Sequence, residues 1–352
     1  MSLDLPSGVN ADNGQAAAHA VQANQTVAFA ALKPAHAVYP GRGLCGEIVL
    51  ADIGIRRSDI QAMDTPFETM TRQQVGTLLP RRQKDTNKGD FGKLLCICGS
   101  DGMTGAACLS AAAAVRCGAG LCTLAAPAQV QAAVASKLNE PTMLLLPQHL
   151  GEKDLDTLVK RLAVSSACLL GCGLGQGERT TKLLQTVLAH ANCPVILDAD
   201  GINCLASDID MIKTATAPVI LTPHMGEMAR LAGFSIEQVL ADRLSIAQSF
   251  AKEHGVVLVL KGAGTIVATP DGRARICTHG NAGMSKGGSG DVLAGMIASF
   301  AAQGIRPADA AVCGVYLHAC AGDRAARRLS QYAMTPTDMI GELGGLFLEY
   351  RL

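Results

Sequence analysis

The feature that most constrains the fold is a series of short apolar runs that alternate with helix-like segments from residue 89 onward. Each run is bounded by Gly, Pro or Asp and is apolar almost throughout. The predicted strands are Leu94–Cys98, Leu121–Ala125, Met143–Leu146, Ala167–Leu170, Val195–Asp198, Val219–Thr222, Val256–Leu260, Thr265–Ala268 and Arg273–Cys277. The predicted helices are Gly105–Cys117, Ala128–Lys137, Arg179–His190, Gly226–Leu231, Ile236–His254, Asp291–Gln303 and Ala308–Ser330. Such strands are typical of a sheet covered on both faces, so the sequence predicts an α/β fold with a mostly parallel central sheet.

The unusual loops of the chain come directly after predicted strands. Because right-handed crossovers bring the carboxyl ends of parallel strands to one edge, these loops should meet there, where open α/β sheets bind ligands. The loops are 99–106 (GSDGMTGA), 171–175 (GCGLG), 198–201 (DADG), 222–227 (TPHMGE) and 261–265 (KGAGT). The sequence therefore predicts one site built from five loops.

A second glycine-rich segment, GNAGMSKGGSGDVLAG, spans residues 280–295 and leads into an apolar helix. Glycines let several backbone N–H groups approach one point, and the first N–H groups of a helix have no partner inside the helix. Both properties favour a bound phosphate, and we expect an anion hole formed by Gly287, Gly288, Ser289 and Gly290. Asp291 adds a carboxylate, which suits a catalytic base better than a simple anion cradle. A plain turn with a helix cap explains one or two of the glycines but not the whole pattern.

The loop that comprises Lys261, Gly262, Ala263, Gly264 and Thr265 is the second candidate. A lysine and two glycines after an apolar strand indicate contact with a nucleotide, although a β-hairpin turn is the alternative. The Walker pattern G-x-x-x-x-G-K-[ST] is absent, so another architecture must hold the nucleotide.

The remaining loops give weaker signals. The GCGLG loop lacks the G-x-G-x-x-G spacing of a dinucleotide fingerprint, so it is either a ligand-facing strand exit or a plain turn. His224 precedes a helix, where it could contact substrate or cap the helix. Asp198 and Asp200 could bind Mg²⁺ through water or serve as structural caps, because Mg²⁺ sites use one or two carboxylates with phosphates.

Composition excludes several functional classes. Hydrophobic residues make up 49 % of the 352 residues and charged residues 17 %, which excludes a mainly disordered chain. Basic and acidic residues balance at 30 each, and aromatic residues amount to 3 %, so we expect no nucleic-acid partner. No apolar run reaches the roughly 20 residues of a membrane helix, and no signal peptide is visible, so we expect no membrane partner. The 13 cysteines lie in apolar surroundings without a C-x₂-C pair, which indicates core thiols in a reducing cytoplasm.

Taken together, the motifs resemble the NAD(P)H-hydrate dehydratase family of the ribokinase-like superfamily. The resemblance covers roughly residues 75 to 350 and rests on seven ordered motifs. They are KGDFGKLLCICGSDGMTGAA, AAAAVRCGAGLCTLAAP, GCGLGQG, LDADGIN, LTPHMGEMARL, LVLKGAGTIVATPDG and GNAGMSKGGSGDVLAG. It implies a three-layer αβα ribokinase-like fold, a homo-oligomer (a tetramer in one possibility), and repair of hydrated NADH or NADPH. The enzyme phosphorylates the added hydroxyl and eliminates phosphate, with Mg²⁺ and with ADP or ATP as donor.

The resemblance also assigns roles. Ala106, Gly175, His224 and Asp291 would contact the hydrate, with Asp291 as the base. Residues 261–265 and Gly290 would contact the nucleotide. Three positions depart from the family pattern, which usually has Pro at Ala282 and Ala-Thr at Ser285-Lys286. Lys286 could help to hold phosphate or point to solvent.

The first residues of the chain resemble a different domain. Residues 1–57, which include DLPSGVN at 4–10, resemble the end of an NAD(P)H-hydrate epimerase domain. Asp4 would match a substrate contact and Ser7 a vestigial potassium ligand, whereas the asparagine- and glycine-rich loop with the other potassium ligands is not present. We therefore expect three parts: a remnant of that domain at 1–57, a linker at 58–74 and the dehydratase domain at 75–352. The helix Thr71–Leu78 is expected where the linker ends, and the remnant should leave a sheet edge unpaired and lack epimerase activity.

Two rival functions remain open at the level of sequence. A vitamin-precursor kinase of the same superfamily would keep the GSGD motif and the sheet, but its phosphoester would accumulate. A non-catalytic nucleotide-binding protein could keep the fold without using Asp291.

Overall fold

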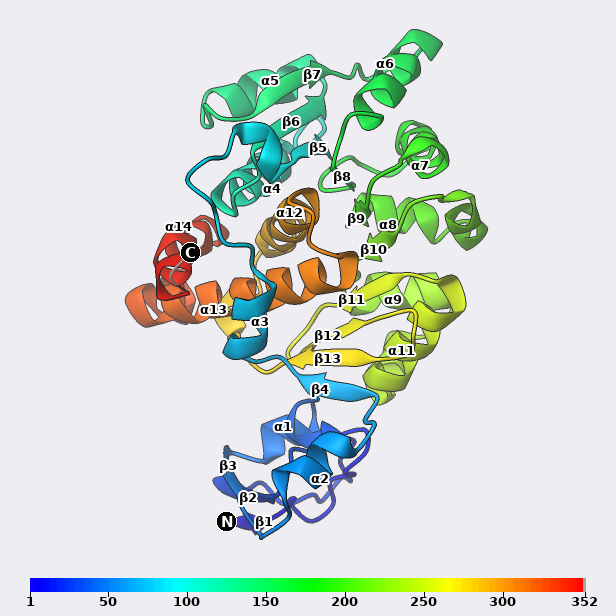
Figure 1. Cartoon of the computed structure of the whole chain (residues 1–352). Helices are drawn as coiled ribbons and strands as arrows, with labels where there is room; N and C mark the ends of the chain where they lie inside the picture. The colour runs from blue at the N-terminus through cyan, green and yellow to red at the C-terminus, as the bar shows by residue number, and fades with distance from the viewer. Residues whose placement is uncertain (351–352) are drawn as a thin grey trace.

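The computed structural model describes residues 1–350, and the side chains of Arg57 and Gln61 are left aside. The core is a ten-stranded sheet in the order β4-β13-β12-β11-β10-β9-β8-β5-β6-β7 (Figure 1). Every strand of this sheet is parallel to the others except β12, which is antiparallel to both of its neighbours. The strands are β4 (Phe67–Thr69), β5 (Lys93–Ile97), β6 (Leu121–Ala126), β7 (Thr142–Leu145), β8 (Ala167–Leu170), β9 (Val195–Leu197), β10 (Val219–Leu221), β11 (Val257–Leu260), β12 (Thr265–Ala268) and β13 (Ala274–Cys277).

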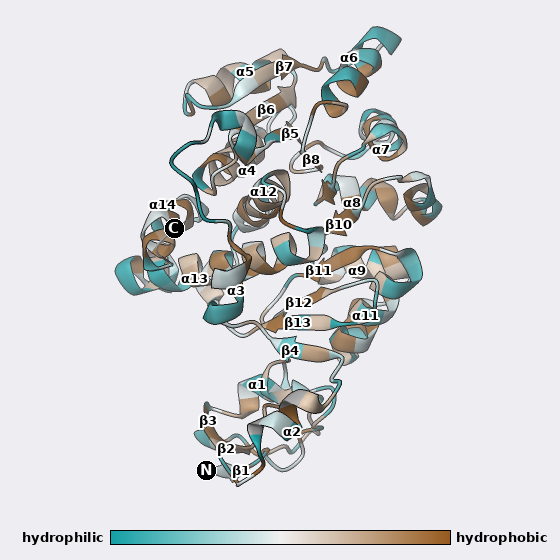
Figure 2. Cartoon of the chain, viewed as in Figure 1, coloured by the Kyte–Doolittle hydropathy of each residue, from teal (hydrophilic) through white to brown (hydrophobic). Residues whose placement is uncertain are grey.

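Helices cover both faces of the large sheet and form two separate cores. In β5, Leu94 and Cys96 enter one core and Leu95 and Ile97 the other, as expected from the alternation of side chains along a strand. The first face carries α3 (Arg72–Leu78), α4 (Thr104–Arg116), α5 (Ala128–Ala135), α12 (Ser289–Ala302), α13 (Pro307–Ala333) and α14 (Pro336–Glu349). The second face carries α6 (Glu152–Leu162), α7 (Glu178–His190), α8 (Asp200–Leu205), α9 (Met225–Ala232), α10 (Ile236–Ala241) and α11 (Arg243–His254). The expected α/β fold with a mostly parallel sheet and three αβα layers is confirmed. Figure 2 shows the strands mostly in hydrophobic brown and the outer faces of α6 and α11 partly in teal.

Helix α12 is the buried centre of the first face, and its close approach to α4 depends on glycine. A Cβ atom on Gly295 would lie 2.2 Å from the carbonyl oxygen of Ser110 in α4. The hydroxyl of Ser299 in α12 also donates to the carbonyl of Ala114, at 2.8 Å. These contacts fix α12 against α4 and so fix the position of its N-terminus.

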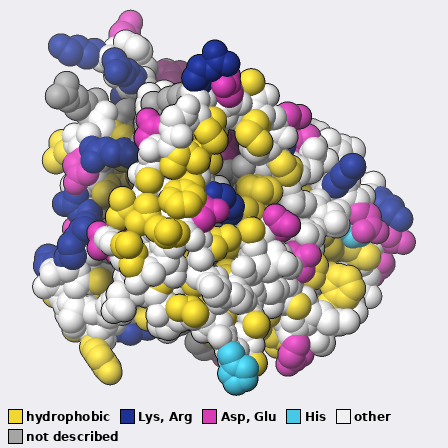
Figure 3. Space-filling model, turned by 90° about the horizontal axis from the view of Figure 1, so that it is seen from below, with side chains coloured by type: hydrophobic (Ala, Val, Ile, Leu, Met, Phe, Trp, Pro, Cys, Tyr) yellow, Lys and Arg dark blue, Asp and Glu magenta, His cyan; other side chains and the backbone are white. Residues whose placement is uncertain are grey.

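The first 57 residues form a smaller unit beside the edge strand β4, at the lower end of Figure 1. Its parallel sheet has the order β1 (Ser2–Leu3), β2 (Gln25–Phe29), β3 (Glu47–Ala51), and it also holds the short helix α1 (Gly41–Leu44). Several large apolar side chains of this unit are exposed, among them Leu3 and Leu50. Seen from below, the molecule has hydrophobic side chains gathered around a few charged ones (Figure 3).

The structure differs from the sequence-based expectation in several places. The segment expected to be a linker contains α2 (Arg57–Ala62) and β4, which pairs with β13 at the edge of the large sheet. The helix expected over 236–254 is two helices that are separated at Asp242, whose non-helical backbone lets its side chain cap α11. Helices α6, α8 and α14 were not predicted.

Candidate active site

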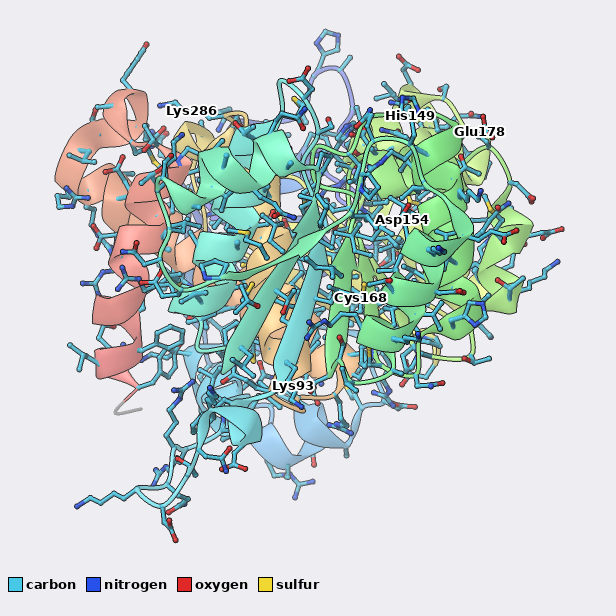
Figure 4. All side chains as sticks on the ribbon, turned by 90° about the horizontal axis from the view of Figure 1, so that it is seen from above. Lys93, His149, Asp154, Cys168, Glu178 and Lys286 are labelled. Carbon is cyan, nitrogen blue, oxygen red and sulfur yellow. The ribbon has the colours of Figure 1, made fainter. Side chains whose placement is uncertain are left out.

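The five loops do meet at the carboxyl edge of the large sheet, together with the N-terminus of α12. In Figure 4 the strands run from the edge where Lys93 begins β5 to the opposite edge, near which Lys286 and His149 lie. Asp198, directly after β9, accepts hydrogen bonds of 2.6 Å from the ammonium group of Lys261 and from the hydroxyl of Thr222. Asp200 accepts a hydrogen bond of 2.8 Å from the backbone N–H of Gly175. Four loops are therefore joined by two carboxylates.

The 99–106 loop is held against the 171–175 loop by van der Waals contact and by a hydrogen bond. The hydroxyl of Ser100 donates to the carbonyl of Gly173 at 2.9 Å. A Cβ atom on Gly173 would lie 2.8 Å from the Cβ atom of Ala106, so glycine is required where the two loops touch. Ala106 and Gly175, both expected to contact the hydrate, thus belong to one pair of touching loops.

The anion hole expected at the start of α12 has the necessary free donors. Among the described residues, the backbone N–H groups of Gly287, Gly288, Gly290 and Asp291 have no acceptor. The N–H of Ser289 is not free, because it donates to the carbonyl of Lys286 at 3.2 Å, but the buried Ser289 hydroxyl has no partner in the described part of the chain. Ser289 could therefore serve an anion through its hydroxyl and not through its amide. Gly288 has φ +100°, so the turn into the helix favours glycine.

Asp291 lies in the first turn of α12, close to a second carboxylate. The side chains of Cys172, Asp198 and Asp291 lie within 4.8 Å of one another. Burial, and then the neighbouring charge of Asp198, raise the pKa of Asp291 to about 6. A carboxylate with that pKa is mostly ionised at neutral pH and is a stronger base than an ordinary aspartate.

Asp198 differs from Asp291 because a cation balances it. Burial acts to raise the pKa of Asp198, but Lys261 outweighs burial and holds that pKa below its ordinary value. Lys261 also lies 3.8 Å from Glu227, and the two carboxylates together outweigh burial and raise the pKa of its ammonium group. The site thus separates two carboxylates into an ion-paired aspartate and a basic one, as acid–base catalysis requires.

The same cluster can be compared with the preferences of Mg²⁺, which the sequence led us to expect. Asp198 and Asp291 offer hard oxygen ligands, and Mg²⁺ usually takes one or two carboxylates together with phosphate oxygens. Cys172 does not fit, because its pKa is raised well above the ordinary value and the thiol stays protonated. Asp200 accepts a single hydrogen bond, from the N–H of Gly175, and its other carboxylate oxygen has no partner among the described residues, so it offers an oxygen ligand as well.

His224 caps α9. Its Nδ1 atom accepts from the N–H of Gly226 at 2.9 Å and of Glu227 at 3.3 Å, and Glu227 accepts from the N–H of His224 at 2.7 Å. Burial, and then the charge of Lys261, lower the pKa of His224, so the ring is neutral. The structure therefore shows the capping role, and the Nε2 atom lies 3.5 Å from a carboxylate oxygen of Glu227.

The position of Lys286 answers a question that the sequence left open. Its ammonium group donates to the carbonyl oxygens of Tyr332 at 2.6 Å and of Met334 at 2.5 Å, which lie where α13 gives way to α14. The side chain neither reaches the anion hole nor extends freely into solvent. It ties the glycine-rich loop to the end of α13, so this departure from the family pattern is structural.

We expect Lys286→Met to lower the free energy of unfolding by roughly 1–3 kcal/mol, the range for hydrogen bonds of a charged donor. The nucleotide KM should change by no more than a few fold. Urea unfolding and steady-state kinetics would measure both quantities. An unchanged stability with a strongly raised KM would contradict this assignment, because it would place the ammonium group at the phosphate.

Two further side chains of α13 support the loop and were not predicted from the sequence. The ring of His318, which is 8 % exposed, makes a 2.9 Å hydrogen bond through Nε2 to the carbonyl of Ser289. Asp323 accepts from the N–H of Gly280 at 3.0 Å and from the side-chain amide of Asn281 at 2.9 Å. The one sequence signal for these contacts is that His318 and Asp323 are polar residues within a largely apolar predicted helix.

In the N-terminal unit, Asp4 lies beside Phe29, the last residue of β2. It pairs with Lys33 and accepts from the N–H of Phe29 at 3.0 Å. His36 makes a 2.7 Å hydrogen bond to the carbonyl of Asp4. The hydroxyl of Ser7 makes no hydrogen bond with the described residues, so its role as a potassium ligand stays a prediction.

Comparison with known proteins agrees with the site. The profile of the NAD(P)H-hydrate dehydratase family matches residues 94–344, and a profile of YjeF-related N-terminal domains matches residues 1–35. A bifunctional NAD(P)H-hydrate repair enzyme of Moorella thermoacetica is 42 % identical over 344 residues, which are 97 % of this chain and 65 % of that protein. The chain thus spans about two thirds of the length of such relatives.

Two relatives of the larger domain alone extend the comparison. An ADP-dependent (S)-NAD(P)H-hydrate dehydratase of Neisseria meningitidis is 39 % identical over 249 residues, covering 69 % of this chain and 80 % of that protein. The crystal structure of an ADP/ATP-dependent NAD(P)H-hydrate dehydratase of Bacillus subtilis, crystallised with ATP and Mg²⁺, superposes with a TM-score of 0.70 at 30 % identity. It covers 82 % of this chain and is itself covered completely. With this fold, the seven ordered motifs and these matches, the chain belongs to the NAD(P)H-hydrate dehydratase family of ribokinase-like proteins.

Proposed function

We propose that this chain dehydrates hydrated NADH or NADPH at the expense of ADP or ATP and so restores the reduced dinucleotide. The observation that carries the proposal is the start of α12, where a basic carboxylate lies beside four free N–H groups and within reach of the Lys261 loop. The family and its relatives supply the substrate class. The principal site residues are Asp291 as base, Gly287, Gly288 and Gly290 as amide donors, and residues 261–265 for the nucleotide.

The chemistry follows from these positions. The ionised carboxylate of Asp291 takes the proton from the hydroxyl of the hydrate while that oxygen attacks the terminal phosphorus of the donor. The bond from this phosphorus to the donor's bridging oxygen breaks, and the shortened nucleotide leaves. The free N–H groups at the start of α12 stabilise the negative charge on the phosphoryl oxygens, a contribution of roughly 3–4 kcal/mol for one such donor. The bond between the ring carbon and the phosphoester oxygen then breaks, inorganic phosphate leaves, and the neighbouring ring carbon gives up a proton to solvent as the ring double bond forms.

Mg²⁺ would be held by the phosphates together with Asp198 or Asp200, which leaves Asp291 to act as the base, and it would neutralise part of the phosphate charge. We further propose that Ala106, Gly175 and the ring of His224 line the place of the nicotinamide ring. The loops of Ala106 and Gly175 touch at the edge of the sheet, and the loop of His224 is joined to the 198–201 loop through Thr222.

The deciding experiment incubates the purified protein with Mg²⁺, hydrated NADH and either ADP or ATP. We expect the absorbance of reduced nicotinamide to return, and inorganic phosphate to appear in equal amount. A phosphoester that accumulates without either signal would favour a vitamin-precursor kinase, and inactivity with both donors would refute the proposal. The comparison of the two donors settles which one the enzyme prefers.

The pH dependence provides a separate prediction. Because Asp291 has its pKa raised to about 6 and acts in its ionised form, kcat/KM should fall tenfold per pH unit well below pH 6 and level off above it. Initial rates between pH 4.5 and 8 would measure this profile. A midpoint near 4 would indicate an ordinary exposed carboxylate and would contradict the role of burial.

For residues 1–57 we propose a supporting role without epimerase activity. The carboxylate of Asp4, which the resemblance would assign to the substrate, is instead engaged by Lys33 and by the N–H of Phe29. An assay that detects interconversion of the two hydrate epimers by this chain would overturn the proposal. We also propose a cytoplasmic location and a homo-oligomer. Within residues 1–350, no helix has the length and apolar character needed to cross a bilayer.

A further inference from the structure

Arg243 is a buried cation beneath the proposed nucleotide loop. It is the first residue of α11 and is 3 % exposed. Its guanidinium group donates to the carbonyl oxygens of Ala263 at 2.6 Å and of Gly264 at 2.9 Å. No carboxylate of the described residues lies within ion-pair distance, and its Nε atom has no partner there. Burial lowers the pKa of Arg243 to about 10, so the group stays charged at neutral pH.

In the 261–265 loop, backbone carbonyl oxygens have hydrogen-bond partners, two of them in Arg243, whereas two backbone N–H groups have none among the described residues. The third carbonyl of the loop, that of Gly262, accepts from the hydroxyl of Thr265 at 2.9 Å. The N–H groups of Ala263 and Gly264 have no acceptor in the described part of the chain. Three carbonyl oxygens of the loop are therefore occupied by donors, two of them by the buried Arg243, while two amide donors have no acceptor there.

The loop is also confined from its other side. Gly264 has φ +67°, and a Cβ atom there would lie 2.6 Å from the carbonyl oxygen of Ala37 in the N-terminal unit. Ala37 and Val38 belong to the apolar core of the second face. The loop is thus held between the N-terminal unit and α11, and Arg243 is the charged part of that support.

We propose that Arg243 is a positioning residue that makes the 261–265 loop an anion-binding loop for the nucleotide phosphates. The inference rests on the proposed function. Two physical effects carry it. The hydrogen bonds from Arg243 keep carbonyl oxygens, which would repel phosphate, away from the ligand. Its charge, which no carboxylate neutralises, adds an attractive potential in a region of low dielectric.

The test compares Arg243→Met, Arg243→Gln and Arg243→Lys with the parent. Arg243→Met removes both effects, Arg243→Gln keeps hydrogen-bond donors without the charge, and Arg243→Lys keeps the charge with fewer fixed donors. Arg82→Met is the matched control, because Arg82 also donates to a backbone carbonyl, that of Gly118, but does so away from the carboxyl edge of the sheet. Binding of Mg-ADP and Mg-ATP is measured by calorimetry, and KM and kcat are measured separately.

We expect Arg243→Met to weaken nucleotide binding and raise the nucleotide KM by about 10²-fold, as a misplaced positioning group can, with a much smaller change in kcat. Arg243→Lys should recover most of the affinity, and Arg243→Gln should lie between the two. Arg82→Met should bind as the parent does. The inference is wrong if Arg243→Met binds nucleotide as tightly as the parent does. It is also wrong if the whole effect is a lower apparent kcat that matches a smaller folded fraction of the protein.

If Arg243→Met does not fold, the Lys and Gln variants decide: equal affinities in both, at the level of the parent, would overturn the role of the charge. Because calorimetry needs no turnover, the inference and the proposed function can fail separately. A parent that binds Mg-ADP but repairs no hydrate refutes the function alone.

Discussion

Asp291→Asn should abolish dehydration and at the same time stabilise the folded protein at neutral pH. Activity should fall by about 10²–10⁴-fold, the usual contribution of a positioned base. The gain in stability follows from the raised pKa of Asp291, which is about 6 in place of the ordinary 3.8. Above pH 6 the folded protein must keep an unfavourable charge that the unfolded chain carries freely, whereas below pH 3.8 both states are protonated and the penalty is absent.

The shift of about 2 pH units corresponds to at most about 3 kcal/mol, at 1.36 kcal/mol per unit. Denaturant unfolding of parent and variant at pH 8 and pH 4 would measure the difference, and the advantage of Asp291→Asn should vanish at the lower pH. Asp271→Asn is the control, since Asp271 lies in the exposed turn between β12 and β13 and a hydrogen bond from Thr269 lowers its pKa. If Asp291→Asn kept the activity of the parent, Asp291 would not be the base and the proposed mechanism would be wrong.

Nine strands of the large sheet, β5 to β13, were predictable because they are short and mostly apolar, whereas β4 (FET) is too short and polar to stand out. The helices that escaped prediction had weaker local signals. Helix α6 is highly charged, and only Leu155, Leu158 and Leu162 mark its buried side. Helix α14 carries three glycines, which disfavour a helix, yet Thr335 caps it and Leu343 and Leu346 are buried against the first core. In both segments, packing against the core rather than local sequence preference determines that a helix forms.

The candidate site was predictable to the level of its loops but not of its connections. Sequence placed both residues at one edge, because Lys261 directly follows an apolar strand and opens a glycine-rich loop, and Asp291 follows glycines at the start of a helix. It could not show that Asp198 pairs with Lys261, nor that Lys286 binds carbonyls of α13, because such contacts depend on the spatial order of strands and helices. Arg243 had no sequence signal, since a helical arginine is usually exposed.

Lys261→Met should be the most destabilising change in the site, with a loss of about 3–5 kcal/mol in the free energy of unfolding. Asp198 is 2 % exposed and Glu227 is 4 % exposed, and the ammonium group of Lys261 is the cation that lies near both. Without it, two buried carboxylates remain next to each other and to Asp291. We also expect the variant to lose nucleotide affinity, because Lys261 is the first residue of the proposed nucleotide loop and ties that loop to Asp198.

A double-mutant cycle separates these two effects. Asp198→Asn in the Lys261→Met background should recover a large part of the lost stability. The second substitution removes the buried carboxylate charge that the first one leaves without its lysine partner. Nucleotide affinity should not return, since the cation is still missing. Urea unfolding of the four proteins and calorimetry with Mg-ADP give both numbers. If the two substitutions add without coupling, the carboxylate of Asp198 does not depend on Lys261 for its charge, and the division of the site into a paired aspartate and a basic one is wrong.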